Sequence, residues 1–168
     1  MTAPTAGPLA GTTVIDLSRA LAGPHAAQVL GDLGARVINV EAAGGADTRG
    51  YGPPFAGPED DPISTYYLSC NRNKESIVLD LKSDDGRETL SRLVGVGDVL
   101  IENFRPGVLD RLGFTVERLH ELNPRLVILK ISGFGEDGPE GGRAGGWSPA
   151  AGRWASDCCS PAMDSRGL

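Results

Sequence analysis

The sequence predicts an α/β protein in which a parallel β-sheet is covered by helices on both faces. The prediction rests on five short segments rich in Val, Ile and Leu, at residues 13–17, 37–41, 76–81, 98–102 and 126–131. These segments are apolar on both faces, as buried strands are, and segments of helical character lie between them. That alternation is typical of parallel strands joined by crossover helices.

Glycine, proline and side-chain capping residues mark the expected helix ends. The expected helices run from Gly23-Pro24 to Leu33 with Gly34 at C′, from Ser83 or Asp84 onward with Leu90, Leu93 and Val94 on one face, from Pro106 at N1 to the Arg111–Gly113 region, and from Thr115 to Leu122. By contrast, residues 44–62 are rich in Gly, Pro and Asp, which predicts a long loop.

Composition limits the class of protein. With 168 residues, 40% hydrophobic and 23% charged, the chain is long enough for one globular domain with a core. The net charge of −6 argues against a nucleic-acid partner, and no apolar run approaches the roughly 20 residues of a membrane span. The N-terminus shows no secretory signal, so we expect a cytoplasmic protein. The cysteines are too few and too poorly spaced for a disulfide framework or a zinc site: Cys70, Cys158 and Cys159.

Two polar segments beside strand ends carry donors for an anion. They are Asn71-Arg72-Asn73-Lys74 and Glu102-Asn103-Phe104-Arg105-Pro106-Gly107. Arg105 stands just before an expected helix N-terminus, where free N–H groups and the helix dipole favour a negative ligand. Ligands of such sheets bind at the carboxyl ends of the strands, which also brings in the segments 18–24, 132–139 and the region from Glu41 onward. The alternative, that these are solvated loop charges, stays open at this point.

Several familiar sites are absent from the sequence. Residues 20–24 after the first strand do not form the G-x-G-x-x-G fingerprint of dinucleotide sites, and neither a P-loop nor a G-x-S-x-G motif is present. The two histidines, His25 and His120, are isolated. The loop carboxylates Asp47, Asp60 and Asp61 lack the company of other metal ligands, so no metal site is expected.

Seven short pieces, spread over most of the chain, together resemble a known family. They are Leu9-Ala10-Gly11 with Val14-Ile15-Asp16-Leu17-Ser18-Arg19, Leu21-Ala22-Gly23-Pro24, Leu30-Gly31-Asp32-Leu33-Gly34-Ala35, Asn71-Arg72-Asn73-Lys74-Glu75-Ser76, Leu79-Asp80-Leu81-Lys82, Glu102-Asn103-Phe104-Arg105-Pro106-Gly107, and Ile131-Ser132-Gly133-Phe134-Gly135 with Gly138-Pro139. Each piece alone is weakly specific, but in this order they are highly specific. The chain resembles the class III CoA-transferases, the family of formyl-CoA transferase and CaiB-type enzymes that also includes α-methylacyl-CoA racemase.

This resemblance implies a fold, a ligand and a partner. It implies a Rossmann-like α/β domain over residues 1–145 that binds coenzyme A or an acyl-CoA and is incomplete at its C-terminus. For the full-length protein it implies an interlocked homodimer. The residues that it assigns to CoA binding are Leu21, Ala22, Leu79, Asp80, Leu81, Lys82, Asn103, Phe104, Arg105 and Arg111.

The family chemistry implied by the resemblance is covalent. An aspartate attacks the thioester of an acyl-CoA, forms an anhydride, and then passes CoA to a small carboxylic acid. The resemblance puts that aspartate beyond the end of this chain, so no catalytic residue is assigned. The expected function is that of an acyl-CoA:carboxylate CoA-transferase fragment with little or no turnover. The alternatives are a racemase-type isomerase and a non-catalytic CoA-binding fragment.

Residues 146–168 depart from the family pattern. The stretch begins Gly146-Trp147-Ser148-Pro149 and shows neither helical nor strand periodicity. We expect it to be poorly ordered. One hypothesis is a frameshift near codon 145, because Trp147-Ser148-Pro149 read one frame away can encode Leu-Val-Ala, a sequence common at this point in the family.

Overall fold

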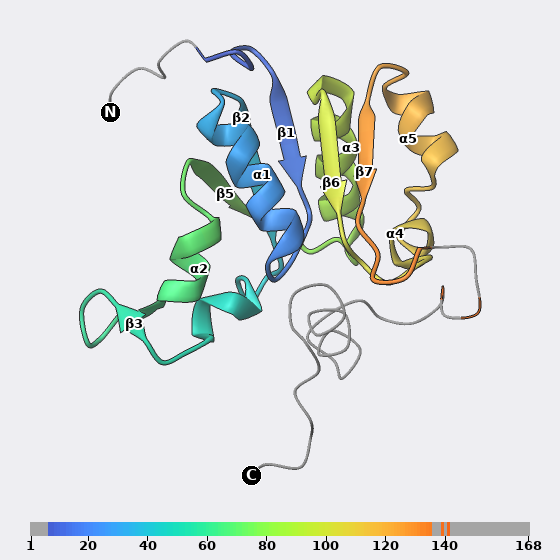
Figure 1. The fold of residues 1–168 in the computed structure, drawn as a ribbon. Helices are drawn as coiled ribbons and strands as arrows, with labels where there is room; N and C mark the ends of the chain where they lie inside the picture. The colour runs from blue at the N-terminus through green and yellow to red at the C-terminus, as the bar shows by residue number, and fades with distance from the viewer. Residues whose placement is uncertain (1–6, 136–138, 140, 142–168) are drawn as a thin grey trace.

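The protein is built on a five-stranded parallel β-sheet. The computed structural model describes residues 7–135, 139 and 141 of the chain. The strand order is β5-β2-β1-β6-β7, and all carboxyl ends lie at one edge of the sheet (Figure 1). The strands are β1 (Thr13–Asp16), β2 (Arg36–Glu41), β5 (Lys74–Val78), β6 (Val99–Glu102) and β7 (Val127–Lys130). The predicted α/β class with a parallel sheet is confirmed.

Strand β5, the third of the five strands in chain order, has other bounds than predicted. It was expected at residues 76–81, but β5 runs from Lys74 to Val78. The N–H of Leu79 makes the last bond to β2, donating to the carbonyl of Glu41 at 2.9 Å. Asp80 then accepts the backbone N–H of Lys82 at 3.0 Å, which is the chemistry of an Asx turn. This turn ends the strand although Leu79 and Leu81 are apolar.

The helices divide between the two faces of the sheet. Helix α1 (Ala22–Asp32) packs on one face, and α3 (Asp84–Val96) and α5 (Val116–Leu122) pack on the other (Figure 1). The predicted N-caps of the latter two are confirmed, because Ser83 accepts from Gly86 N–H and Thr115 accepts from Arg118 N–H. In the part of the chain that the structure describes, no helix is long and apolar enough to cross a membrane.

The helix after β6 begins later than predicted. Pro106 was expected at N1, but α4 spans Val108–Arg111 and its N-cap is Gly107. Gly107 has a φ of 74°, in the left-handed region that glycine adopts without a steric penalty. The glycine therefore turns the chain into the helix, and Pro106 lies in the loop before it.

The predicted long loop at residues 44–62 contains short ordered elements. It holds a 3₁₀ turn, η1 (Asp47–Gly50), and a small antiparallel pair, β3 (Phe55–Ala56) with β4 (Ile63–Ser64). Helix α2 (Thr65–Cys70) follows and was not predicted. Its N-cap is Ser64, whose hydroxyl accepts the N–H groups of the second and third residues of the helix.

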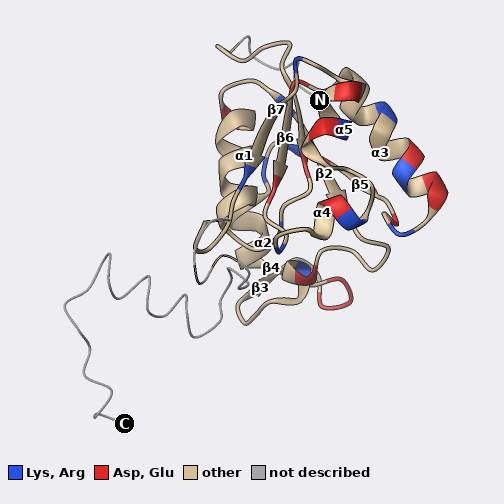
Figure 2. Cartoon of the chain, turned by 90° about the vertical axis from the view of Figure 1, so that its right-hand side faces the viewer, with Lys and Arg blue, Asp and Glu red and all other residues tan. Residues whose placement is uncertain are grey.

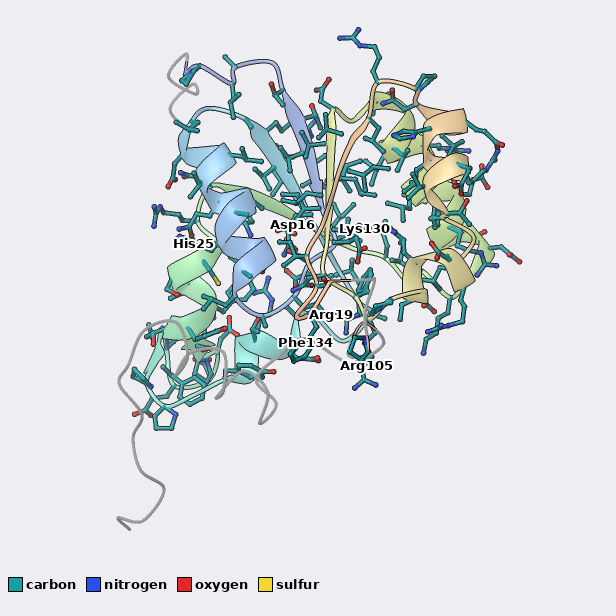
Figure 3. All side chains as sticks on the ribbon, turned by 45° about the vertical axis from the view of Figure 1, so that its right-hand side comes forward. Asp16, Arg19, His25, Arg105, Lys130 and Phe134 are labelled. Atoms are coloured by element: carbon teal, nitrogen blue, oxygen red, sulfur yellow. The ribbon has the colours of Figure 1, made fainter. Side chains whose placement is uncertain are left out.

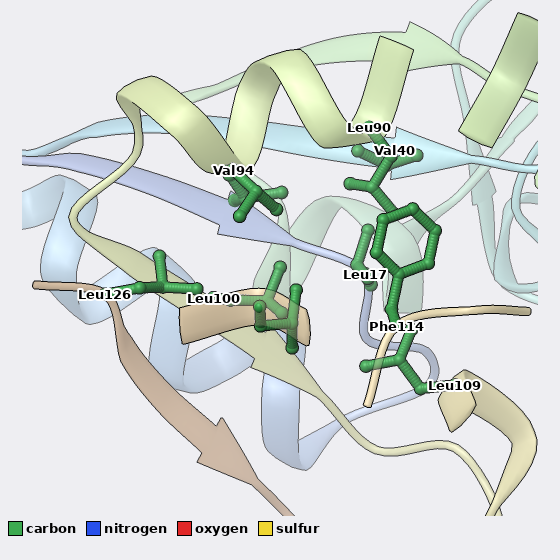
Figure 4. Close-up of a cluster of buried hydrophobic side chains, with 10 residues drawn as sticks. Leu17, Val40, Leu90, Val94, Leu100, Leu109, Phe114 and Leu126 are labelled. Carbon is green, nitrogen blue, oxygen red and sulfur yellow. The ribbon is translucent and has the colours of Figure 1, made fainter. Parts of the chain in front are cut away.

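Two apolar clusters stabilise the two faces of the sheet. Ile15, Leu100 and Leu119 belong to the larger cluster, under α3 and α5 (Figure 4). The smaller cluster, under α1, contains Val14, Ala27, Ala35, Val37 and Ile101. At β7 the side chains that face the α1 side are exposed, Val127 to 61% and Leu129 to 39%. Helices cover both faces at the centre of the sheet as predicted, and among the described residues none covers this face of β7.

The cluster under α3 gives a test within one helix. Val94 is fully buried, whereas Val96 of the same helix is 74% exposed. We expect Val94→Ala to lower the free energy of unfolding by about 2 kcal/mol, because it deletes buried apolar volume. Val96→Ala should change it by no more than about 0.5 kcal/mol. Urea denaturation of both variants measures the difference, and equal losses would contradict the packing described here.

Candidate functional site

The carboxyl edge of the sheet holds the candidate site. The strand order changes direction between β1 and β6, and in sheets of this kind ligands bind in the crevice at that point. The side chain of Asn103 joins the loops after these two strands. Its Oδ1 accepts the N–H of Arg19 at 2.8 Å, and its Nδ2 donates to the carbonyl of Arg19 at 2.7 Å. The two loops are therefore fixed relative to each other.

A groove of about 360 Å³ opens at this edge. Its walls come from the loops after β1, β2, β5 and β6 and from α4. The lining residues are Leu17, Arg19, Val40, Glu41, Ala42, Leu79, Asp80, Leu81, Lys82, Phe104, Arg105, Val108 and Leu112. Apolar walls with a few charged groups are typical of a site for an organic ligand with anionic parts.

Three cationic side chains line the groove. Arg19 and Arg105 lie at the same end of the sheet (Figure 3), and Lys82 stands on the loop after β5. The guanidinium of Arg19 lies 5.6 Å from the centre of the Phe104 ring and 4.0 Å from the carboxylate of Asp47. Within the described residues, no carboxylate forms an ion pair with Lys82 or Arg105. These two charges are therefore available to an anion from solution.

Hydrogen bonds fix the backbone that carries Lys82. The carbonyl of Asp80 accepts the N–H of Ser83 at 3.0 Å and its hydroxyl at 2.7 Å. The guanidinium of Arg87 donates to the carbonyl of Lys82 at 2.7 Å. At Gly86, a Cβ would come within 2.0 Å of the carbonyl oxygen of Asp80, so only glycine allows the first turn of α3 to pack this closely.

Charged groups on α3 and α5 are more evenly mixed. Along α3 and α5, acidic and basic side chains alternate and pair within each helix (Figure 2). Examples are Arg92 with Glu88 at 2.5 Å and Arg118 with Glu121 at 2.9 Å. Exposed pairs of this kind contribute little to stability. The unpaired cations of the groove differ from this pattern.

A second, smaller cavity of about 70 Å³ lies beside the groove, and the buried residue Glu41 lines both. The carboxylate of Glu41, at the end of β2, is 4% exposed as a residue and accepts two bonds from Arg49 at 2.6 and 2.8 Å. It also accepts the hydroxyls of Ser76 at 2.6 Å and Tyr67 at 3.0 Å, and the N–H of Ala46 at 2.7 Å. This network ties η1, α2 and β5 to the end of β2.

The network shifts the pKa values of its members. The bonds from Arg49 lower the pKa of Glu41 to about 2, against the opposing effect of burial, with help from Ser76 and Ala46. Burial and the adjacent Glu41 carboxylate raise the pKa of Tyr67 to about 12. Glu41 is thus a charged acceptor at every physiological pH, and its lone pairs are taken by protein donors.

The occupied carboxylate argues against a dinucleotide site. In dinucleotide-binding folds an acidic residue after the second strand accepts the ribose hydroxyls. Here Glu41 occupies that place, but its oxygens already accept six bonds from five residues of the chain. This agrees with the absence of the glycine fingerprint after β1.

The structure brings most of the predicted CoA-binding residues together. Six of them line the groove: Leu79, Asp80, Leu81, Lys82, Phe104 and Arg105. Asn103 lies beside it and bonds the backbone of Arg19. The guanidinium of Arg111 lies against Gly107, 3.3 Å from where a Cβ there would stand. Leu21 and Ala22 are exposed at the start of α1 and line neither cavity.

Other groove residues were not assigned from the sequence. They are Leu17, Arg19, Val40, Glu41, Ala42, Val108 and Leu112. Their common signal is position, because five of the seven lie at or just after the carboxyl ends of β1 and β2. Arg19 is the most informative of them, since it adds a third cation and lines both cavities.

The basic segment before β5 does not supply free donors. The ammonium of Lys74 is 2% exposed and lies 2.9 Å from the carboxylate of Asp16. The guanidinium of Arg72 lies 2.5 Å from the carboxylate of Asp32 at the end of α1. Lys74 is therefore enclosed, and neither the anion-site interpretation nor solvation describes it. The Arg72 side chain is 59% exposed and its charge is paired with Asp32. Among the described residues, no group of three His, Cys, Asp or Glu side chains is placed to hold a metal ion.

The fold and the groove together define an α/β protein with a cationic ligand site at the switch in strand order. Comparison with known proteins specifies it further. The profile of CoA-transferase family III matches residues 9–151, and the chain belongs to that family.

Two curated relatives carry names that describe CoA transfer. The human succinyl-CoA:glutarate CoA-transferase is 48% identical over 139 residues, covering 82% of this chain and 31% of that protein. The acetyl-CoA:oxalate CoA-transferase of Acetobacter aceti is 51% identical over 134 residues, covering 79% of this chain and 33% of that protein. The chain thus spans about a third of the length of the curated relatives it matches.

Solved structures agree with the fold. A CAIB/BAIF family protein from Brucella suis superposes with a TM-score of 0.80 at 48% identity, covering 84% of this chain and 37% of that one. Rv3272 from Mycobacterium tuberculosis superposes with a TM-score of 0.82 at 37% identity, covering 94% and 43%. The sequence-based assignment to the CaiB/BaiF type of CoA-transferase is confirmed.

The Glu41 network predicts a pH dependence of stability. The folded-state pKa of about 2 lies below the ordinary 4.5, so this stabilisation is present above about pH 4.5 and is lost as the pH falls toward 2. The shift corresponds to at most about 3 kcal/mol. We expect Glu41→Gln to be less stable than the unmodified protein at pH 7, and the gap to close between pH 5 and pH 2. Urea denaturation across this range tests it, and a constant gap would refute it.

Proposed function

We propose that the groove binds the nucleotide end of coenzyme A or of an acyl-CoA. The observation that carries this proposal is the set of cations at one edge of the sheet, of which Lys82 and Arg105 have no carboxylate partner among the described residues. Coenzyme A carries a 3′-phosphate and a diphosphate, which need such charges. Membership of CoA-transferase family III supports the same ligand.

Each part of the groove has a role in this proposal. Arg19, Lys82 and Arg105 bind phosphate oxygens, with Arg111 behind them at the end of α4. The apolar wall that includes Val40 and Leu79 packs against the adenine ring. Arginine forms paired bonds to phosphate, whereas lysine acts as a point charge, so the two residue types are not interchangeable here. Leu21 and Ala22, at the exposed start of α1, contact the chain that leads to the thioester.

The reaction that we propose for the full-length protein is CoA transfer between an acyl-CoA and a carboxylic acid. A carboxylate oxygen of an aspartate attacks the thioester carbonyl, the C–S bond breaks, and the CoA thiolate leaves behind an acyl-aspartyl anhydride. The thiolate then attacks the aspartyl carbonyl of the anhydride, which releases the first carboxylate and leaves an aspartyl-CoA thioester. The carboxylate of the second acid attacks this thioester, the thiolate leaves again and attacks the acyl carbonyl of the new anhydride, and the products are the second acyl-CoA and the free aspartate. The described residues contribute by binding and orienting the CoA end, which brings the thioester close to its attacker.

The names of the relatives indicate a general class of substrates. The names of two of them specify succinyl-CoA with glutarate and acetyl-CoA with oxalate. We therefore propose an acyl-CoA and a small carboxylic acid as the substrate pair, in the cytoplasm. We also propose an interlocked homodimer for the full-length protein. Light scattering on that protein tests the dimer, and a monomeric mass would reject it.

The CoA proposal predicts which charges matter for affinity. We expect Lys82→Met and Arg105→Met each to raise the Kd for coenzyme A roughly tenfold or more, because each removes a charge-assisted hydrogen bond. Titration calorimetry on the 168-residue chain measures the Kd. The matched control is Arg118→Met, an exposed arginine paired with Glu121 on α5, and it should leave the Kd unchanged. Absence of CoA binding by the unmodified chain would refute the proposal.

An assay of turnover distinguishes CoA binding from catalysis. We propose that this chain alone binds CoA without catalysing thioester exchange, because the family resemblance assigns the attack on the thioester to none of the described aspartates. An assay of exchange between acetyl-CoA and a labelled carboxylic acid is expected to show only the background rate. Exchange above background that disappears with Lys82→Met would show that the chain carries its own catalytic group, and would overturn this part of the proposal.

A further inference from the structure

The loop between β1 and α1, residues 17–21, has a backbone conformation that its own sequence disfavours. Ala20 has a φ of 62°, in the left-handed region that clashes with a Cβ atom. A residue other than glycine keeps such a conformation where surrounding contacts impose it, and such residues cluster at functional sites. The loop also carries Arg19, which lines both cavities.

A fully buried ion pair lies at the base of this loop. The side chains of Asp16 and Lys74 are 0% and 2% exposed, and Nζ lies 2.9 Å from Oδ2. The other carboxylate oxygen, Oδ1, accepts the backbone N–H of Ser18 at 3.0 Å and also the Ser18 hydroxyl. An unpaired buried carboxylate would be costly, so the ammonium of Lys74 is what allows Asp16 to hold Ser18 from inside the protein.

The ion pair connects the loop to β5 and α2. The ammonium of Lys74 also donates to Oδ1 of Asn71 at 2.9 Å, and the amide of Asn71 donates to the carbonyl of Tyr67 at 2.9 Å. The thiol of Cys70 donates to the carbonyl of Ala20 at 3.7 Å. Residues 70–74 therefore contact the loop at two points. Cys70 bonds the backbone of Ala20, and Lys74 pairs with Asp16.

The loop in turn sets the first turn of α1. Ser18 packs directly on Gly23, where a Cβ would come within 2.2 Å of the Ser18 side chain. Asn103 fixes both backbone groups of Arg19 from the opposite side. Contacts thus run without a gap from Lys74 through Asp16 and Ser18 to the start of α1.

We infer that Lys74 is a positioning residue for the ligand site. It acts through Asp16 and Ser18 to hold the loop that presents Arg19 and the start of α1 to the groove. Its own ammonium is enclosed and touches no ligand. The inference rests on the proposed function of the groove as a CoA site, and it adds a role for the basic segment that precedes β5.

The test uses a pair of substitutions that leave the net charge unchanged. The double variant Asp16→Asn/Lys74→Met replaces both charges with neutral groups of similar size, so no unpaired charge remains buried. We expect its Kd for coenzyme A to rise at least tenfold, measured by calorimetry on the 168-residue chain. Amide resonances of residues 18–23 should shift, and those of α5 should not. A Kd within twofold of the unmodified chain would overturn the inference.

The control separates positioning from lost stability. Val94→Ala removes buried volume under α3 but leaves the Asp16–Lys74 pair and the bonds of Ser18 in place, and it should leave the Kd unchanged at a temperature where the chain stays folded. A Kd raised equally by Val94→Ala would overturn the inference, because affinity would then follow stability alone. Failure of the unmodified chain to bind coenzyme A would instead count against the proposed function.

A milder variant covers the case in which the double variant does not fold. Ser18→Ala keeps the ion pair and removes only the hydroxyl bond to Asp16. We expect it to weaken coenzyme A binding about threefold and to shift the amide resonances of Ala22 and Gly23. An unchanged Kd together with unchanged resonances would overturn the inference by itself.

Discussion

Two carboxylates at the carboxyl edge of the sheet, Asp16 and Glu41, are buried, and each is neutralised by one cation of the chain. Asp16 pairs with Lys74, and Glu41 pairs with Arg49. Removing either cation would leave a buried charge that costs several kcal/mol. Lys74 lies 58 residues after Asp16, and Arg49 lies eight residues after Glu41 at the end of β2. These two pairs therefore determine how the segments that follow β2 pack against the sheet. This packing in turn fixes the positions of the loops around the groove.

The same edge therefore contains cations of two kinds. Some are used inside the protein, such as Lys74 and Arg49, whose partners are buried. Others, such as Lys82 and Arg105, stand on loops whose backbone is fixed but whose charge has no carboxylate partner in the described structure. Composition and net charge do not separate the two kinds, since the chain as a whole is acidic. The fold determines which cations find a buried partner and which remain exposed. The exposed ones give the groove a positive local charge, opposite to the net charge of the molecule.

Local patterns in the sequence were sufficient for the sheet, because its strands are apolar on both faces. They failed where a polar contact determines the end of an element. The turn at Asp80 ends β5 before Leu81, and Ser64 caps the six-residue helix α2. The hydrogen bonds to Glu41 come from five other residues spread along the chain from Asn39 to Ser76, so no local spacing signals them. Most of the predicted groove residues followed from resemblance to a family rather than from pattern. Arg19 lies in the segment 18–24 that the strand-end rule indicated, but neither the pattern nor the resemblance assigned it individually.

The alanine at position 20 has a thermodynamic consequence of its own. Its left-handed φ of 62° costs roughly 1–2 kcal/mol relative to an unstrained residue. Glycine would remove that strain, but it would also give the unfolded chain about 0.4–1 kcal/mol more conformational entropy to lose. The two effects largely cancel, so overall stability hardly distinguishes the residues. What distinguishes them is the width of the native ensemble, because an alanine held by its neighbours samples fewer backbone states than a glycine would.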